Sequence, residues 1–298
     1  MTQVTTIFRP ITTTTCGGLQ GGVTPAKHIY CKTCESEEHG RKLLRQFLKI
    51  LAGKRSDAAA YNTSTENSLR PDAPFYAVGD IHGCVDLLQV LLGQIGRAAD
   101  EQIVFLGDYI DRGPDSAATL KALYDLSHRR PGKVTCLLGN HEKMMCDFID
   151  DPLGRGARWS QFGGRETLAS YGIDIPVTPS SDELLEACDA LEAALPSPIL
   201  PWLRAMPLSW NSGNVWCVHA AMDPERAPDM QRSRTLLWGH KAFLGQRRQD
   251  GNCVVHGHTV VQNPSNRDSR ISVDTGAYMT GRLTAAYVSQ ESCEFIST

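Results

Sequence analysis

Short apolar runs recur along the chain from Pro74 onward, and each leads directly into a cluster rich in glycine, histidine, aspartate or asparagine. A strand that is buried on both faces is apolar at successive positions, so these runs predict buried strands. The five runs are Phe75–Val78, Ile103–Leu106, Val134–Leu138, Val215–Val218 and Cys253–Val255.

Three stretches between these runs have the apolar spacing of helices. They are Val85–Ile95, Ser116–His128 and Glu142–Ile149, the last of which starts directly after Asn140 and His141. A repeated order of strand, loop and helix predicts an α/β fold. In such folds the polar groups at the carboxyl ends of the strands form the functional site.

The last part of the chain has a different pattern. Ile271–Val273, Leu283–Ser289 and Cys293–Ile296 lie close together in sequence and predict antiparallel strands that close a second sheet. Residues 154–207 are richer in helical and loop sequence, and we expect this insertion to overhang the site.

The first 73 residues differ in composition from the remainder. Threonine runs and glycine pairs predict a poorly ordered extension before a domain over residues 74–298. Arg41–Arg55 has leucines at helical spacing among basic residues, which predicts a short amphipathic helix. Docking of this helix on its own domain is favoured over binding to a membrane surface or a partner. Cys31 and Cys34, flanked by two histidines, fit a zinc site or free thiols, and the unspecific spacing favours thiols.

Composition narrows the class of protein. Apolar residues make up 41% of the 298 residues and charged residues 21%, which is enough to bury a large core. With 30 basic and 33 acidic residues, the net charge of −3 argues against nucleic acid as a partner. No run of 18 apolar residues is present, and residues 1–15 lack the apolar segment of a secretory signal. We therefore expect a cytoplasmic protein without integral membrane association, whose ten cysteines are free thiols.

Five polar clusters follow the five apolar runs. They are Gly79–Gly83 (GDIHG), Gly107–Gly113 (GDYIDRG), Gly139–Glu142 (GNHE), Val218–Ala220 (VHA) and His256–Thr259 (HGHT). Each cluster alone is weak evidence, since Asn140, for example, is also a suitable helix cap. Their recurrence at every predicted strand end favours a shared site of carboxylates, imidazoles and an amide, a donor set that suits manganese, iron or zinc. Two such cations about 3.5–4 Å apart can catalyse displacement at phosphorus.

In this order, the five clusters resemble the motifs of the calcineurin-like metallophosphoesterases, and within them the phosphoprotein phosphatase branch with its bacterial serine/threonine phosphatases. The resemblance covers roughly Phe75–Ser289. It implies a two-sheet β-sandwich core flanked by helices, with the site at the strand ends. It also implies two divalent metal ions per chain, most simply manganese, and direct attack of a metal-bound hydroxide on phosphorus.

The resemblance also implies residue roles. The metal ligands would be Asp80, His82 and Asp108 for the first metal and Asn140, His219 and His258 for the second, with Asp108 shared. His141 would be the general acid, Asp111 its charge partner, and Arg112 the group that holds phosphate oxygens. His256 would lie behind the ligands and orient one of them.

One departure from the family pattern concerns a second phosphate contact. Relatives often carry an arginine after a Leu-Leu-Trp stretch, whereas here Leu236–Gly239 is followed by His240 and Lys241. Lys241, His240 or the upstream Arg234 would take this role, or the contact is missing.

The substrate class stays open among three hypotheses. Asp111–Ser116, Glu142 and the insertion-like stretch Trp159–Gly172 favour a phosphoprotein, or a small phosphate ester, as the substrate. The pair Gly83-Cys84 is common in symmetrical dinucleoside tetraphosphate hydrolases, which are the alternative. An inactive binding module of the same fold is the third hypothesis, and the oligomeric state is open.

Overall fold

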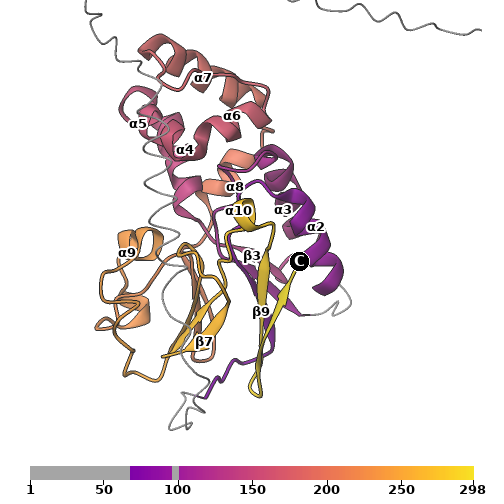
Figure 1. Ribbon diagram of the computed structural model, residues 1–298, viewed down its shortest axis with the longest axis vertical. Helices are drawn as coiled ribbons and strands as arrows, with labels where there is room; N and C mark the ends of the chain where they lie inside the picture. Colours follow the sequence, from indigo (N-terminus) through magenta and orange to yellow (C-terminus); the bar gives the residue numbers. More distant parts are fainter. Residues whose placement is uncertain (1–67, 96–100) are drawn as a thin grey trace, which may run out of the picture. The chain divides into compact units, whose positions relative to one another are not determined.

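Two five-stranded sheets pack face to face in the computed structural model, which describes residues 68–95 and 101–298 (Figure 1). The first sheet has the order β10-β9-β1-β2-β3, and the second has the order β4-β5-β6-β8-β7. The strands of the first are β1 (Phe75–Val78), β2 (Gln102–Phe105), β3 (Val134–Cys136), β9 (Thr284–Val288) and β10 (Cys293–Ser297). Those of the second are β4 (Ser209–Ser212), β5 (Val215–Val218), β6 (Cys253–His256), β7 (Ser265–Arg267) and β8 (Arg270–Ser272). The predicted two-sheet sandwich is confirmed.

The residues of strand β1 are apolar at every position because both faces of the strand are buried. Phe75 and Ala77 belong to the core between the two sheets, whereas Tyr76 and Val78 belong to the core beneath the helices. Successive side chains of a strand point to opposite faces, so both faces of this strand are buried. The strand pairs in parallel with β2, and β2 pairs in parallel with β3.

The expectation for the last strands was wrong in part. Residues 270–272 do form a strand of the second sheet, β8, which is antiparallel to β7 as expected and also pairs in parallel with β6. Strands β9 and β10 form a hairpin that joins the first sheet, with β9 antiparallel to β1. Small side chains fit this place, since Ala286 lies opposite Ala77 at the buried centre of the β1–β9 pair. Periodicity identifies a strand but does not identify its neighbour.

Helices flank the two sheets, and those between residues 152 and 194 lie beyond the ends of the strands (Figure 1). They are α2 (Val85–Ile95), α3 (Ser116–Arg129), α4 (Asn140–Asp150), α5 (Pro152–Trp159), α6 (Arg165–Ser170), α7 (Ser181–Ala194), α8 (Ile199–Arg204), α9 (Ser233–Trp238) and α10 (Ala277–Thr280). A π-helical turn at Ser160–Gly164 connects α5 to α6. The helix predicted over Glu142–Ile149 starts two residues earlier, at Asn140, so two polar site residues lie in its first turn.

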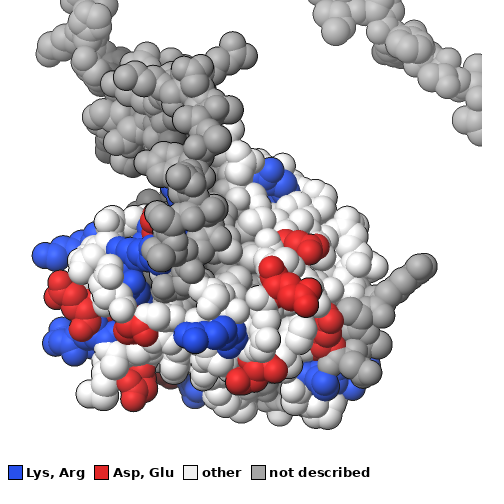
Figure 2. Space-filling view, turned by 90° about the horizontal axis from the view of Figure 1, so that it is seen from below, with Lys and Arg blue, Asp and Glu red and all other residues white. Residues whose placement is uncertain are grey.

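The predicted basic helix and the cysteines at positions 31 and 34 lie outside the described residues. None of the helices in the described part of the chain has the length and apolar character needed to span a lipid bilayer. On the face drawn in Figure 2, acidic and basic side chains are interspersed.

Candidate metal centre

The loops that follow six strands meet at one edge of the sandwich. Parallel strands have their carboxyl ends at the same edge, so residues far apart in sequence come together there. Several of these residues have a left-handed backbone, which is uncommon outside glycine. The positive φ angles of the site are 46° at His82, 53° at Asp108, 71° at Asp111, 70° at Arg112 and 59° at His258. Backbone strain of this kind is concentrated where side chains must be aimed at a functional site.

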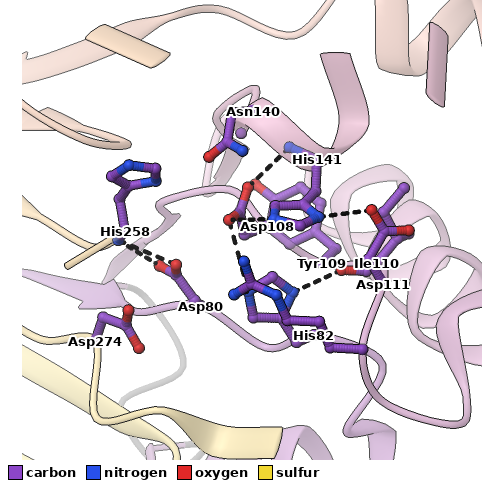
Figure 3. A network of polar contacts seen from close by, with 12 residues as sticks. Asp80, His82, Asp108, Tyr109, Ile110, Asp111, Asn140, His141, His258 and Asp274 are labelled. Carbon is purple, nitrogen blue, oxygen red and sulfur yellow. Dashed lines mark hydrogen bonds and ion pairs between the residues drawn. The ribbon is translucent and has the colours of Figure 1, made fainter. Parts of the chain in front are cut away.

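Asp108 lies at the centre of the site, where two groups of potential metal ligands share it (Figure 3). One group is His82, Asp108 and His141, and the other is Asp108, His219 and His258, with the ligand atoms of each group within 4.8 Å of one another. Its Oδ2 lies 3.6 Å from His82 Nε2, and its Oδ1 lies 3.3 Å from His219 Nε2. The loop approaches closely because Gly139 has no side chain: a Cβ there would lie 2.2 Å from the Asp108 nitrogen.

Backbone carbonyls determine the tautomers of two histidines. His82 Nδ1 lies 2.7 Å from the Ile110 oxygen, and His219 Nδ1 lies 3.0 Å from the Leu106 oxygen. A carbonyl oxygen only accepts, so each Nδ1–H donates, and each Nε2 presents its electron pair toward Asp108. This arrangement of an imidazole between a backbone acceptor and the site is typical of metal ligands.

The protonation states also suit a cation. Burial lowers the pKa of His82 to about 3 and that of His258 to about 4, and it lowers the pKa of His219 as well. Burial would raise the pKa of Asp108, but interaction with the surrounding histidines, His219 first, holds it below its ordinary value. At neutral pH the histidines are therefore neutral and the carboxylate is ionised, as metal binding requires.

Three polar atoms lie close to His219 Nε2. Asn140 Oδ1 lies 2.8 Å from it, Asp108 Oδ1 lies 3.3 Å from it, and His258 Nδ1 lies 3.2 Å from it. The oxygens of Asn140 and Asp108 direct electron pairs toward the unprotonated Nε2 of His219, and a cation among these atoms removes the repulsion between them. The oxygen and nitrogen donors present here therefore fit a divalent metal ion.

Asp80 is a predicted ligand that belongs to neither group. Both of its carboxylate oxygens accept the backbone N–H of His258, at 3.1 and 3.0 Å (Figure 3). Burial, and then the charges of Asp274 and Asp108, raise its pKa. Among the described residues, the backbone amide of His258 is the donor that reaches this buried carboxylate, while Asp274 acts on it as a like charge.

Asp274 is a site residue that our sequence analysis missed. Its side chain is buried, it accepts the Gly276 N–H at 2.9 Å, and burial raises its pKa to about 6. It follows β8 as the other acidic residues follow their strands, so the same pattern of strand, acidic residue and glycine was available to find it.

His141 and Asp111 form a buried pair, with His141 Nδ1 2.6 Å from Asp111 Oδ2. Trp159 Nε1 donates to the same carboxylate at 2.9 Å, and Thr167 Oγ1 donates to it at 2.6 Å. Burial alone would lower the pKa of His141, but the charges of Asp108 and Asp111 outweigh it and raise the pKa. Neither Trp159 nor Thr167 had an assigned role, because both lie in the helical insertion far along the chain.

Arg112 is half-buried at the mouth of the site. Its Nη1 donates to His82 Nε2 at 2.9 Å, and its guanidinium lies 5.2 Å from the centre of the Tyr278 ring. Both residues line a cavity of about 540 Å³, which Phe162 and Gly163 also line. The sequence pattern did not identify Tyr278.

The remaining residues that the sequence predicted to support the ligands or to bind phosphate do not all lie at the metal centre. His256 is buried, with Nε2 2.8 Å from Ser272 Oγ and Nδ1 donating to the Gly257 oxygen at 3.0 Å. Lys241 is exposed, and among the described residues it has no hydrogen bond or ion pair to the site. His240 lies 3.8 Å from Asp223. Arg234 lines a second cavity beside α4.

Glu142 organises the loop that carries Asp108. Its buried carboxylate accepts backbone N–H groups from Asp108 at 2.9 Å, Tyr109 at 2.7 Å, Ile110 at 3.2 Å and Gly139 at 3.1 Å. One side chain thus satisfies four donors that lack another partner in a strand or helix. The residue supports the site without facing it.

We expect the Glu142→Leu variant to be less stable by about 3 kcal/mol or more, because buried N–H donors would lose their acceptor. The melting temperature should fall by roughly 10 °C. Thermal unfolding followed by circular dichroism measures this change, with the exposed Glu186→Leu as the matched control. An unchanged melting temperature for Glu142→Leu would contradict the role of this carboxylate.

Residues 73–283 match the family of calcineurin-like phosphoesterases, and the chain belongs to this family. A symmetrical bis(5'-nucleosyl)-tetraphosphatase of Ectopseudomonas mendocina is 44% identical over 50% of this chain and 45% of its own length. The asymmetrical bis(5'-nucleosyl)-tetraphosphatase PrpE of Oceanobacillus iheyensis is 24% identical over 74% of this chain and 90% of its own length. A crystal structure with the provisional name diadenosine tetraphosphatase superposes with a TM-score of 0.52 at 19% identity, covering 76% of this chain and 94% of that one. The chain spans about half the length of the first symmetrical relatives that it matches.

Proposed function

We propose that this chain is a metal-dependent phosphoesterase that hydrolyses bis(5'-nucleosyl) tetraphosphates. The observation that carries the proposal is the position of Asp108, whose carboxylate belongs to both groups of potential metal ligands. A shared carboxylate is what two adjacent divalent cations require. The donor set of carboxylates, imidazoles and an amide fits manganese, iron or zinc, and manganese is the metal that we propose first. The metal identity and a cytoplasmic location stay predictions from the sequence.

The first metal ion would be held by Asp108 and His82, with Asp80 as a further proposed ligand. The second would be held by Asp108, Asn140, His219 and His258. When bound, such ions neutralise charge on phosphoryl oxygens and make water more acidic. His256 would support β6 behind these ligands through its bond to Ser272.

The chain's own side chains would supply the remaining parts of the reaction. The planar guanidinium of Arg112 can donate two parallel hydrogen bonds to phosphate oxygens, which a lysine cannot do. His141 would donate its Nε2 proton to the leaving oxygen, and Asp111 would keep the ring protonated and oriented through Nδ1. Water would attack phosphorus directly in this proposal, without a phosphorylated residue.

The names of the relatives support a dinucleoside polyphosphate as the substrate. The phosphoprotein hypothesis depended on three sequence features, the Asp111–Ser116 stretch, Glu142 and the stretch Trp159–Gly172. In the structure, Ser116 and Glu142 are fully buried, and both accept backbone N–H groups from residues 108–111. They organise the loop whatever the substrate is, so they no longer favour a phosphoprotein.

A side-by-side assay tests the proposal. The manganese-loaded full-length chain is given diadenosine tetraphosphate, a phosphoserine peptide and 4-nitrophenyl phosphate. We expect kcat/KM for the dinucleotide to exceed that for the peptide by at least about tenfold, since substrate preference reflects differences in transition-state binding. A preference for the peptide would support the phosphoprotein hypothesis instead. No turnover of any of the three substrates would support an inactive binding module.

A further inference from the structure

A cavity of about 470 Å³ lies beside the metal centre, between α4, α5 and α9. Its size is within the range of about 300–1,000 Å³ that is typical of small-molecule sites. Four of its lining residues are basic and two are tryptophans: Lys143, Arg155, Arg158, Arg234, Trp159 and Trp238.

The walls of this cavity continue from the residues of the metal centre. Helix α4 begins with Asn140 and His141 and then supplies Lys143 to the cavity. The Trp159 ring lines the cavity while its Nε1 donates to Asp111. Helix α9, which supplies Arg234 and Trp238 to the cavity, is also bonded to the metal centre, because the N–H of Ala220, the residue after His219, donates to the oxygen of Leu236. A ligand in the cavity would therefore extend from the reacting phosphate.

Two positive charges in the cavity have no anionic partner within residues 68–95 and 101–298. Lys143 pairs with Asp147, and Arg155 lies 3.8 Å from Asp151. By contrast, neither Arg158 nor Arg234 has a hydrogen bond or ion pair in that part of the chain. The guanidinium of Arg158 instead lies over the rings of Trp238, at 5.6 Å, and Phe162, at 5.7 Å. Free guanidinium groups beside an aromatic face suit a ligand that has both phosphates and a planar ring.

The same arginine also connects this cavity to the one beside Arg112. Phe162, which contacts Arg158, lines the 540 Å³ cavity together with Arg112 and Tyr278. Both cavities thus combine guanidinium groups with aromatic rings, and they adjoin at the Arg158–Phe162 pair. Two adjoining cavities of this kind suit a substrate that has a central chain of phosphates and an aromatic base at each end.

We infer that the cavity between α4, α5 and α9 binds one nucleotide half of a dinucleoside polyphosphate, an inference that rests on the proposed function. Arg158 and Arg234 pair with the oxygens of the phosphates beyond the reacting one. Trp238, whose side chain is 36% exposed, offers its ring as a stacking face for the base. The cavity beside Arg112 receives the other half.

Kinetics on two substrates test this inference. For Arg234→Ala and for Trp238→Ala, we expect the ratio of kcat/KM for diadenosine tetraphosphate to that for 4-nitrophenyl phosphate to fall. The fall should be about 10–100-fold, mainly through KM, as is usual for lost hydrogen bonds to charged groups. Arg232→Ala is the matched control, because this exposed arginine on the N-terminal side of α9 does not line the cavity.

A binding measurement separates this inference from the proposed function. Isothermal titration of the manganese-loaded chain with ADP should give a Kd that rises at least about tenfold in both variants and stays constant in Arg232→Ala. If no dinucleotide is hydrolysed but ADP binding shows this dependence, the proposed function fails and the cavity assignment stands. If dinucleotides are hydrolysed but neither the ratio nor the Kd changes in the variants, the cavity assignment is wrong. It is equally wrong if ADP does not bind, or if a phosphoserine peptide alone loses affinity.

Discussion

The Asp108→Asn variant should bind fewer than two metal ions per chain, and its kcat/KM for any phosphate ester should fall by about 10³-fold or more. The substitution removes the one carboxylate that belongs to both groups of potential ligands. An amide oxygen has no charge, so neither cation would be neutralised by it. Elemental analysis and steady-state kinetics on the same sample measure both effects.

The matched control for this prediction is Asp115→Asn, which makes the same chemical change at an exposed position in the next turn of chain. It should keep the metal content and the activity of the wild type. If Asp108→Asn keeps two metal ions per chain and a kcat/KM within about tenfold of the wild type, the proposal that Asp108 binds both metal ions is wrong.

His141→Asn is expected to lower kcat by about 10²–10⁴-fold, the usual contribution of a general acid, without loss of metal. The reason is geometric, because Nδ1 is occupied by Asp111 and Nε2 lies 3.8 Å from Asp108 Oδ2, facing the site. Since His141 also belongs to one group of potential ligands, metal content discriminates between the two roles. Loss of metal would show that His141 is a ligand, and the exposed His128→Asn serves as the control.

The pH dependence of kcat gives an independent readout of the same side chain. Burial lowers the pKa of His141, but Asp108 and then Asp111 outweigh this effect and raise it above its ordinary value. A general acid acts in its protonated form, so the wild-type kcat should fall as the pH rises through this pKa. In Asp111→Asn the fall should occur at lower pH, because a charge that favours the protonated ring is absent. In His141→Asn this alkaline limb should be missing.

Most strands of the core could be predicted because their apolar runs are continuous. Phe75–Val78 and Val215–Val218 are strands with the predicted bounds, and each leads into a loop of the site. The hairpin of β9 and β10 was assigned to the wrong sheet, since strand pairing depends on which buried surfaces fit together. Ala286 and Ala77 are more than two hundred residues apart in sequence but lie opposite each other in the sheet. No local sequence pattern predicts such a pairing.

The candidate site was predictable in its residue types but less so in its contacts. The motifs identified His82, Asp108, Asn140, His219 and His258, which the structure brings together. They did not indicate that Asp80 would face the His258 amide and Asp274.

The sequence by itself determined the core strands that end at the site, the three helices between them and the kinds of donor at each of these strand ends, because apolar periodicity and residue chemistry are local properties. Tertiary structure alone decided which donors face one another, as with His258 and Asp80, 178 residues apart. It also decided their protonation states, because burial and neighbouring charges shift the pKa values of His82 and His141 in opposite directions. Distances and desolvation arise only when the chain folds, and for that reason metal affinity and proton transfer depend on the folded structure.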